Sequence, residues 1–244
     1  MAERLEGRNP ILEALKSGRT IEKIVLAKGE KHGSVRKIIQ LAKEKGIIIQ
    51  ETEKKKLDLI TKSANHQGVI AYVAAHSYVA VEDILAIAEE RGEDPFVLVL
   101  DGIEDPHNLG SIMRSADGAG VHGVIIPERR AVGLTAAVAK TSAGAIEHLA
   151  VAKVTNIGRT IEFLQEKGLW VAGADMQGTL YTEADLTGPL ALVIGNEGKG
   201  ISRLVKEKTD FLLRIPMQGR VSSLNASVAT AVYLAQIYSN RFPS

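Results

Sequence analysis

Hydrophobic and polar positions follow two different patterns along the chain, and the change comes near residue 95. Before residue 75, short apolar runs of strand length are separated by amphipathic stretches of helical length. The predicted elements are a short helix that Pro10 starts and Gly18 ends, strands at 23–27, 47–50 and 69–74, and helices at 35–45 and 54–61. Because these elements follow one another closely, they predict a compact α/β unit over residues 1–75.

From residue 96 onward, apolar strands and helices alternate regularly. Strands are expected at 96–100, 122–126, 149–154, 169–174, 190–195 and 211–216, and helices at 109–118, 134–140, 157–167 and 223–240. Strands separated by helices predict a parallel sheet that is covered on both faces. Between the two units, residues 79–91 predict an acidic helical connector, so the expected boundaries are 1–75, 76–95 and 96–244.

The composition narrows the possible chemistry. With 244 residues, 45% of them apolar and 24% charged, the chain is long enough for two units and too hydrophobic for disorder. It has no cysteine, which excludes disulfides, thiolate nucleophiles, iron–sulfur clusters and the radical chemistry that needs them. Its apolar runs fall far short of the roughly 20 residues of a membrane span, and the first residues lack the apolar core of a signal peptide. We therefore expect a cytoplasmic protein without membrane contact.

Charge is unevenly distributed although the net charge is only +1. Residues 1–75 hold 15 Lys and Arg against 9 Asp and Glu, residues 76–95 hold 1 against 6, and residues 96–244 hold 14 against 14. A basic first unit suggests contact with a polyanion, although a run such as 54–56 is on its own more commonly a solvated surface. Tyr72 is the only aromatic residue before position 76, so RNA binding there would depend on charge and shape rather than on base stacking.

Three polar segments accompany three of the predicted strands, at the edge where a parallel sheet would hold its ligand. They are DGIEDPHNLGSIMRSADGAG at 101–120, LALVIGNEGKGIS at 190–202 and IPMQGRVSSLNASVAT at 215–230. The glycine-rich GNEGKG has neither the spacing of a P-loop nor that of a dinucleotide site. Alone, it could be no more than a tight turn from strand to helix.

Together the three segments closely resemble the motifs of the SpoU/TrmH family of RNA ribose 2′-O-methyltransferases, part of the SPOUT superfamily. The matching residues are Asp105, Pro106, Asn108, Gly110 and Arg114 in the first segment, Gly195–Gly198 in the second, and Ile215–Met217 with Ser223–Asn225 in the third. Two further stretches, GRNPILEAL from Gly7 and HQGVIA from His66, resemble the subgroup that methylates a guanosine of 23S rRNA.

The resemblance implies an α/β fold whose C-terminal SPOUT domain has a parallel sheet and a deep trefoil knot, although chains as a rule do not thread loops. A small α/β RNA-binding domain of the ribosomal-protein type would precede it. The implied cofactor is S-adenosyl-L-methionine, bound by Gly195, Asn196, Ile215 and Leu224, with Met217 lining the adenine slot. Isoleucine and leucine at such positions could equally be core residues. A homodimer is implied, in which the arginine of one subunit reaches the cofactor of the other.

Methyl transfer to a ribose hydroxyl requires alignment of the reacting atoms and a polar group near the hydroxyl proton. The candidates are Asn108, Arg114, Glu197, Ser223 and Asn225. Because a guanidinium is effectively never deprotonated, the hypothesis has Arg114 bind the target phosphate and polarise the nucleophile. Glu197 would orient a partner or accept a hydrogen bond. Alternatively, Arg114 pairs with Asp117 at i+3 and Glu197 is a solvated loop carboxylate.

Other interpretations of these residues remain open. A hard-metal site on Asp101, Glu104, Asp105 and His107 is a weak alternative, since an Asp-Pro pair commonly shapes a turn, and we expect no metal. The expected partner is RNA, with 23S rRNA first and tRNA second, and Arg8, Asn9 and residues near His66 would face it. The chain could instead be a non-catalytic RNA-binding or ribosome-assembly factor. The intact Arg114, Glu197 and Asn225 favour the enzyme.

Overall fold

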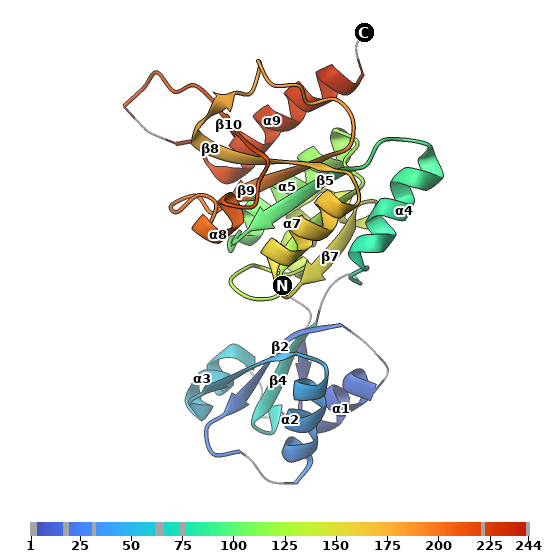
Figure 1. The fold of residues 1–244 in the computed structure, drawn as a ribbon. Coiled ribbons are helices and arrows are strands. Elements are labelled where there is room, and N and C mark those ends of the chain that lie inside the picture. Colours follow the sequence, from blue (N-terminus) through green and yellow to red (C-terminus); the bar gives the residue numbers. More distant parts are fainter. Residues whose placement is uncertain are drawn as a thin grey trace. The chain divides into compact units, whose positions relative to one another are not determined.

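The computed structural model describes residues 4–16, 20–30, 33–61, 66–73, 77–220 and 223–242. The chain divides into two compact units, one of Met1–Ser77 with Leu134–Ala136 and one of Tyr78–Gly133 with Ala137–Ser244 (Figure 1).

The first unit has a four-stranded mixed sheet in the order β1-β4-β2-β3. Its described elements are β1 (Arg4–Glu6), α1 (Arg8–Lys16), β2 (Ile21–Ala27), α2 (Ser34–Glu44), β3 (Ile48–Thr52), α3 (Lys54–Thr61) and β4 (Val69–Val73). Strands β2 and β3 are parallel, whereas β4 is antiparallel to both β1 and β2. Every element predicted for this unit is present, and β1 is an addition that the apolar pattern did not predict.

Alternation along β2 builds the two sides of this first core. Ile24 and Leu26 are buried with α1 and α2, while Val25 and Ala27 are buried with Leu57 of α3. Because successive side chains of a strand point to opposite faces, one apolar strand is covered by helices on both sides.

The acidic segment that was expected to be a connector is the helix α4 (Val81–Arg91), and it is part of the second unit. Ile84 and Ala88, four residues apart on one face of α4, are buried, and Ile84 belongs to the core of the sheet. A Cβ at Gly123 would lie 2.6 Å from Ile84 Cδ1, so the helix packs directly on a glycine of the sheet. Its acidic residues occupy the solvent side.

The second unit has a six-stranded sheet in the order β10-β8-β9-β5-β6-β7, and all its neighbouring strands are parallel. Its strands are β5 (Phe96–Asp101), β6 (Gly123–Pro127), β7 (Ala150–Val154), β8 (Trp170–Leu180), β9 (Leu190–Gly195) and β10 (Phe211–Arg214). Its helices besides α4 are α5 (Pro106–Gly118), α6 (Ala136–Thr141), η2 (Ala145–Glu147), α7 (Ile157–Glu166), α8 (Arg203–Lys206) and α9 (Ala226–Arg241). The predicted parallel sheet is confirmed.

Both faces of this sheet are buried. Val97 and Val99 of β5 pack in one cluster with α7 and α4, and the alternate residues Leu98 and Leu100 are fully buried as well. Helices α5 and α9 pack against each other. The buried residues of α9 are Ala226, Thr230, Tyr233, Leu234 and Ile237. In the described part of the chain, none of the helices combines the length and the apolar character needed to cross a bilayer.

Candidate active site

Glu197 joins the three polar segments at the carboxyl edge of the sheet. Its Oε1 accepts a hydrogen bond from Asn108 Nδ2 at 2.7 Å and one from the backbone amide of Ala226 at 3.3 Å. Asn225 Nδ2 donates to the same oxygen and also to Asn108 Oδ1 at 3.0 Å. The sequence prediction that these three segments converge is therefore confirmed. Glu197 is not the purely solvated loop carboxylate of the alternative interpretation.

Helix caps place two members of this cluster. Asp105 caps α5, where its Oδ1 accepts from the backbone amide of His107 at 2.8 Å and Pro106 occupies the first turn. The cap starts the helix just before Asn108, which is only 7% exposed. At the other helix, Asn225 caps α9 through Oδ1, which accepts from the amides of Ser227 and Val228. This leaves its Nδ2 group to donate to the cluster.

The loop after β9 folds back on itself in a way that only glycine permits. The backbones of Asn196 and Gly200 exchange two hydrogen bonds, of 3.1 and 2.8 Å. A Cβ at Gly195 would lie 2.0 Å from the carbonyl carbon of Gly200, which no side chain can do. Asn196 Nδ2 donates to the carbonyl of Gly102 at 2.9 Å, so this loop is tied to the end of β5.

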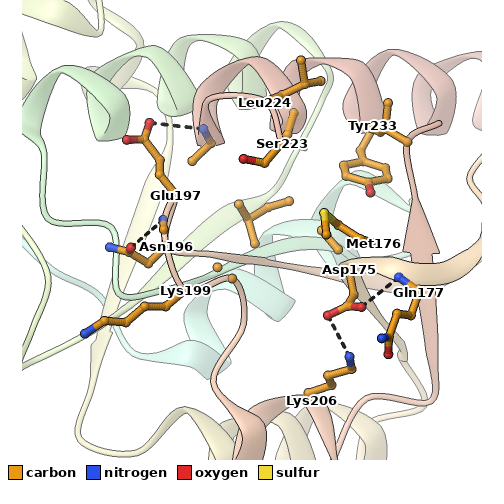
Figure 2. A pocket seen from close by; sticks show the side chains of 18 of the residues that line it. Asp175, Met176, Gln177, Asn196, Glu197, Lys199, Lys206, Ser223, Leu224 and Tyr233 are labelled. Carbon is orange, nitrogen blue, oxygen red and sulfur yellow. Dashed lines mark hydrogen bonds and ion pairs between the residues drawn. The ribbon is translucent and has the colours of Figure 1, made fainter. Parts of the chain in front are cut away.

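A cavity of about 420 Å³ lies beside this loop (Figure 2). Every residue predicted to bind the cofactor lines it, namely Gly195, Asn196, Ile215, Met217 and Leu224, and so do the predicted catalytic residues Glu197 and Ser223. Asn108 and Asn225 do not line the cavity, but both donate hydrogen bonds to Glu197, which does. The cavity and the polar cluster therefore share one side chain.

Arg114 neither lines the cavity nor hydrogen-bonds to the polar cluster. It is exposed on α5, and neither the alternative ion pair with Asp117 nor another hydrogen bond of its guanidinium forms among the described residues. Its charge is therefore available to another molecule.

The far wall of the cavity was not predicted from the sequence; its residues are Asp175, Met176, Gln177, Lys206 and Tyr233. Lys206 Nζ lies 2.8 Å from Asp175 Oδ2. Partial burial by itself would raise the pKa of Asp175, but the Lys206 ammonium and the Gln177 amide outweigh it and hold this pKa below its usual range. Burial, and then the charge of Asp175, raise the pKa of Tyr233 to about 12. An aspartate directly after the apolar run 169–174 was the available signal.

Two of the four candidate metal ligands, Asp105 and Asp101, have structural roles. Asp105 caps α5, and Asp101 Oδ2 accepts from the backbone amide of Ser202 at 2.8 Å. Among the described residues, no three His, Asp or Glu side chains are grouped so as to hold a metal ion.

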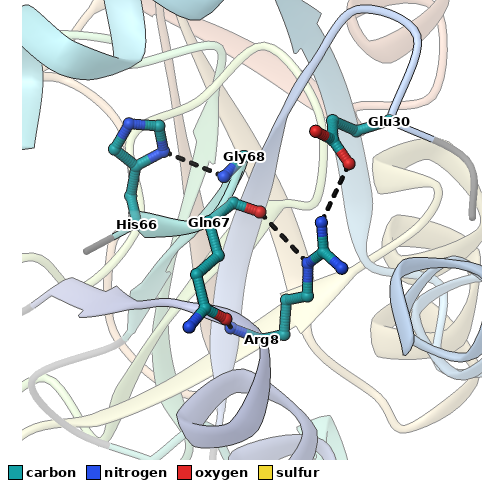
Figure 3. A network of polar contacts seen from close by, with 5 residues as sticks. All are labelled: Arg8, Glu30, His66, Gln67 and Gly68. Atoms are coloured by element: carbon teal, nitrogen blue, oxygen red, sulfur yellow. Dashed lines mark hydrogen bonds and ion pairs between the residues drawn. The ribbon is translucent and has the colours of Figure 1, made fainter. Parts of the chain in front are cut away.

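In the first unit, Arg8 and His66, which were expected at or near the RNA, are used internally (Figure 3), whereas Asn9 is exposed. Arg8 pairs with Glu30 at 2.9 Å, and its Nε donates to the carbonyl of Gln67 at 3.2 Å. His66 is 2% exposed, and its Nδ1 accepts from the amide of Gly68 at 3.0 Å. The positive charge of Arg8 is therefore matched by a carboxylate, and His66 is a buried support for the turn that precedes β4.

Comparisons with known proteins decide the family. Residues 95–235, more than half of the chain, match the model of the SpoU rRNA methylase family. The chain belongs to the SpoU rRNA methylase family. Residues 4–79 match a second model, that of RNA 2′-O ribose methyltransferase substrate binding. The predicted SpoU/TrmH family is thus confirmed, and with it the predicted class of enzyme, an RNA 2′-O-methyltransferase.

Relatives match this SpoU-family chain over nearly its whole length. The putative TrmH family tRNA/rRNA methyltransferase YacO of Bacillus subtilis (strain 168) is 52% identical over 238 residues, which is 97% of this chain and 95% of that one. The putative TrmH family tRNA/rRNA methyltransferase of Staphylococcus saprophyticus is 48% identical over 236 residues, or 96% and 94% of the two chains.

Solved structures agree with the SpoU fold. The AdoMet-bound rRNA methyltransferase of Sinorhizobium meliloti superposes with a TM-score of 0.60 at 26% identity, covering 96% of this chain and 85% of the other. An RNA 2′-O ribose methyltransferase structure gives 0.56 at 25% identity, covering 97% and 88%. The methyl donor of the SpoU family is S-adenosylmethionine, as predicted.

Proposed function

We propose that this protein transfers a methyl group from S-adenosylmethionine to a ribose 2′-hydroxyl of RNA, with a guanosine of 23S rRNA as the first candidate and tRNA as the second. The observation that carries the proposal is the shared Glu197, which lines the cavity and also holds Asn108 and Asn225 of the other two motifs. One site thus offers a small-molecule cavity next to a polar cluster.

The cavity fits the cofactor. Its volume of about 420 Å³ lies within the range of roughly 300–1,000 Å³ that is usual for small-molecule sites. The glycine at 195 lets backbone approach a ligand closely, and Ile215, Leu224 and Met217 supply an apolar wall for a purine. We assign cofactor binding to Gly195, Asn196, Ile215, Met217 and Leu224. Once bound, the sulfonium supplies an activated methyl group.

The polar cluster positions the ribose hydroxyl in this proposal. Glu197 and Ser223, which line the cavity, are the groups that can accept or share the hydroxyl proton. Asn108 and Asn225 hold the Glu197 carboxylate through hydrogen bonds and act as positioning residues. Arg114 binds the phosphate of the target nucleotide and polarises its hydroxyl through the planar fork of its guanidinium.

Arg114 meets the cavity of a second copy of the chain in the proposed homodimer. It is exposed on α5 and lacks a partner among the described residues of its own chain. Helix α9, which packs on α5, exposes Val228 and Tyr238, each 48% accessible, and offers apolar surface for a partner. Sedimentation analysis tests the dimer. An experimental structure traced from residue 215 to residue 226 tests the proposed trefoil knot.

The first unit binds the RNA in this proposal, as a domain of the ribosomal-protein type. Its match to a substrate-binding model supports this role. So does its positive charge, since residues 1–75 contain 15 basic and 9 acidic side chains. Since Arg8 is neutralised internally, exposed lysines such as those at 54–56 on α3 carry the contact.

Replacing these three lysines by glutamine should weaken RNA binding and lower its salt slope by about 2, at roughly 0.7 per phosphate contact. Cofactor affinity should stay unchanged. RNA affinity equal to wild type would contradict this role.

The decisive assay supplies labelled S-adenosylmethionine with transcribed 23S rRNA or with tRNA and maps the methylated ribose. We expect methylation of a 23S rRNA guanosine by the wild type and at least a hundredfold slower methylation by Arg114→Lys, which keeps the charge but loses the fork. Methylation of tRNA alone would favour the second substrate. Methylation of neither RNA would point to the non-catalytic factor. We also propose a cytoplasmic location, which is compatible with an RNA substrate.

A further inference from the structure

Strand β8 carries a bulge at the far wall of the cavity. Its Ala172 and Gly173 pair with Phe211 and Leu212 of β10, but the next pair joins Leu213 to Thr179. Residues 174–178 therefore have no partners on β10 and loop out of the ladder. Bulges are used next to functional sites to redirect side chains, and this one directs Asp175, Met176 and Gln177 to the cavity.

A glycine fixes the end of this bulge. A Cβ at Gly178 would lie 2.3 Å from the carbonyl carbon of Leu212 and 2.5 Å from the amide nitrogen of Leu213. Both are backbone atoms, so only glycine lets β8 return to β10 at this point. The bulge is thus a defined feature of the fold rather than a loose loop.

The Asp175 carboxylate inside the bulge is held by two donors and still reaches the cavity. Its Oδ2 lies 2.8 Å from Lys206 Nζ and its Oδ1 accepts from the Gln177 amide at 2.9 Å. The side chain of Asp175 is 20% exposed and that of Lys206 is 31% exposed. Each carboxylate oxygen has two lone pairs, so each keeps one for a ligand. The nearby Tyr233 hydroxyl donates to the Leu213 carbonyl, so it has no proton left to donate to a ligand.

We propose that Asp175, fixed by Lys206 and by the β8 bulge, accepts hydrogen bonds from the two ribose hydroxyls of the nucleoside part of the methyl donor. This inference rests on the proposed function and adds a binding subsite to it. Figure 2 shows Asp175 and Lys206 on the side of the cavity away from Glu197. The nucleoside ribose therefore lies at the bulge, and the reacting methyl group lies toward Glu197 and the RNA.

Charge balance favours a neutral diol over the zwitterionic amino-acid end of the donor. Asp175 already has Lys206 as its counter-ion, so a diol adds two hydrogen bonds without bringing further charge into a partly buried site. The ammonium and the carboxylate of the amino-acid end would have to separate Asp175 from Lys206, and both would lose their own hydration. Carboxylates that accept from ribose hydroxyls serve the same purpose in dinucleotide sites.

Calorimetry on the full chain tests the subsite with S-adenosylhomocysteine and with 5′-methylthioadenosine, which keeps the ribose and lacks the amino acid. Asp175→Asn should weaken both ligands by the same factor, about tenfold to a hundredfold, as expected for hydrogen bonds to a charged group. Lys206→Met, which keeps the carboxylate, should weaken both ligands less. The matched control Glu207→Gln removes a carboxylate from an exposed ion pair with Arg203 outside the cavity and should change neither.

A further ligand removes the proposed contact by lacking the ribose hydroxyls, instead of by changing the protein. For the 2′,3′-dideoxy analogue of methylthioadenosine, Asp175→Asn and wild type should bind equally, because the analogue has no hydroxyl for the carboxylate. Weaker binding of S-adenosylhomocysteine alone would place the amino-acid end at Asp175 and overturn the inference. Unchanged affinity for both ligands would also overturn it while leaving the proposed function intact. Failure of the wild type to bind either ligand would overturn the proposed function itself.

Discussion

Glu197 is the side chain whose removal separates the structural from the chemical role of the polar cluster. In Glu197→Ala, Asn108 Nδ2 loses its acceptor at a site where Asn108 is only 7% exposed. Leaving a buried donor unpaired costs about 1–3 kcal/mol. Asn225 and Ala226 lose the same acceptor, but Glu197 itself is exposed and water can replace it for them at roughly 0.5 kcal/mol each.

The expected total is about 2–4 kcal/mol, which corresponds to a fall in the Tm of the second unit of about 4–16 °C. Glu197→Gln keeps an oxygen that can accept the same hydrogen bonds and loses only the charge. Its free energy of unfolding should therefore lie within about 1 kcal/mol of the wild-type value. Since the proposal uses the carboxylate next to the reacting hydroxyl, we expect this variant to methylate RNA at least tenfold more slowly.

Calorimetric melting and initial methylation rates measure the two effects on the same preparations. Glu207→Ala is the control for stability, because it deletes a carboxylate of an exposed pair with Arg203, worth about 0–1 kcal/mol. If Glu197→Ala has the same Tm as the control variant, the cluster does not join the three motifs. If Glu197→Gln retains the full rate, the charge has no part in the reaction.

Two further predictions concern the fold around the site. Burial lowers the pKa of His122, more than its hydrogen bond with Glu93 raises it. The unfolded chain therefore binds a proton that the folded chain does not, so stability is complete above about pH 6.5 and falls as the pH drops from there toward the lowered pKa. Urea unfolding at pH 7.5 and 5.5 should show this loss, and His122→Gln should reduce it. An equal pH slope in the variant would contradict the assignment. Gly195→Ala should abolish S-adenosylhomocysteine binding in calorimetry, because its Cβ would lie 2.0 Å from Gly200. Gly118→Ala, with nothing within 4 Å of its Cβ, should bind as wild type does. Normal binding by Gly195→Ala would show that the loop opens at little cost.

Several features follow from the sequence alone because they depend on local physics. The alternation of apolar strands and helices predicts the parallel sheet, and the ends of its strands predict where the motifs meet. The helix expected at 109–118 is present within α5, which starts three residues earlier, and the glycine at 195 marks a tight turn. These signals depend on residues within a few positions of one another.

Other features depend on contacts that no local pattern encodes. Strand β1 has three residues, too few to show alternation, and it exists through pairing with β4. The acidic charges of α4 hid its buried Ile84 and Ala88 from a prediction based on composition. Arg8 was expected to be a free cation, yet Glu30, 22 positions away, neutralises it.

The division between sequence and tertiary structure is clearest at the cavity. The motifs carry residues for the near wall and for the polar cluster, and their chemistry can be interpreted from their identity. The far wall comes from a register shift between β8 and β10, where Gly178 fits against the backbone of Leu212 and directs Asp175 inward. Register is a property of two paired strands, so neither strand determines it alone. The sequence determined which chemical groups are present, and the packing of the strands decided which of them share one cavity.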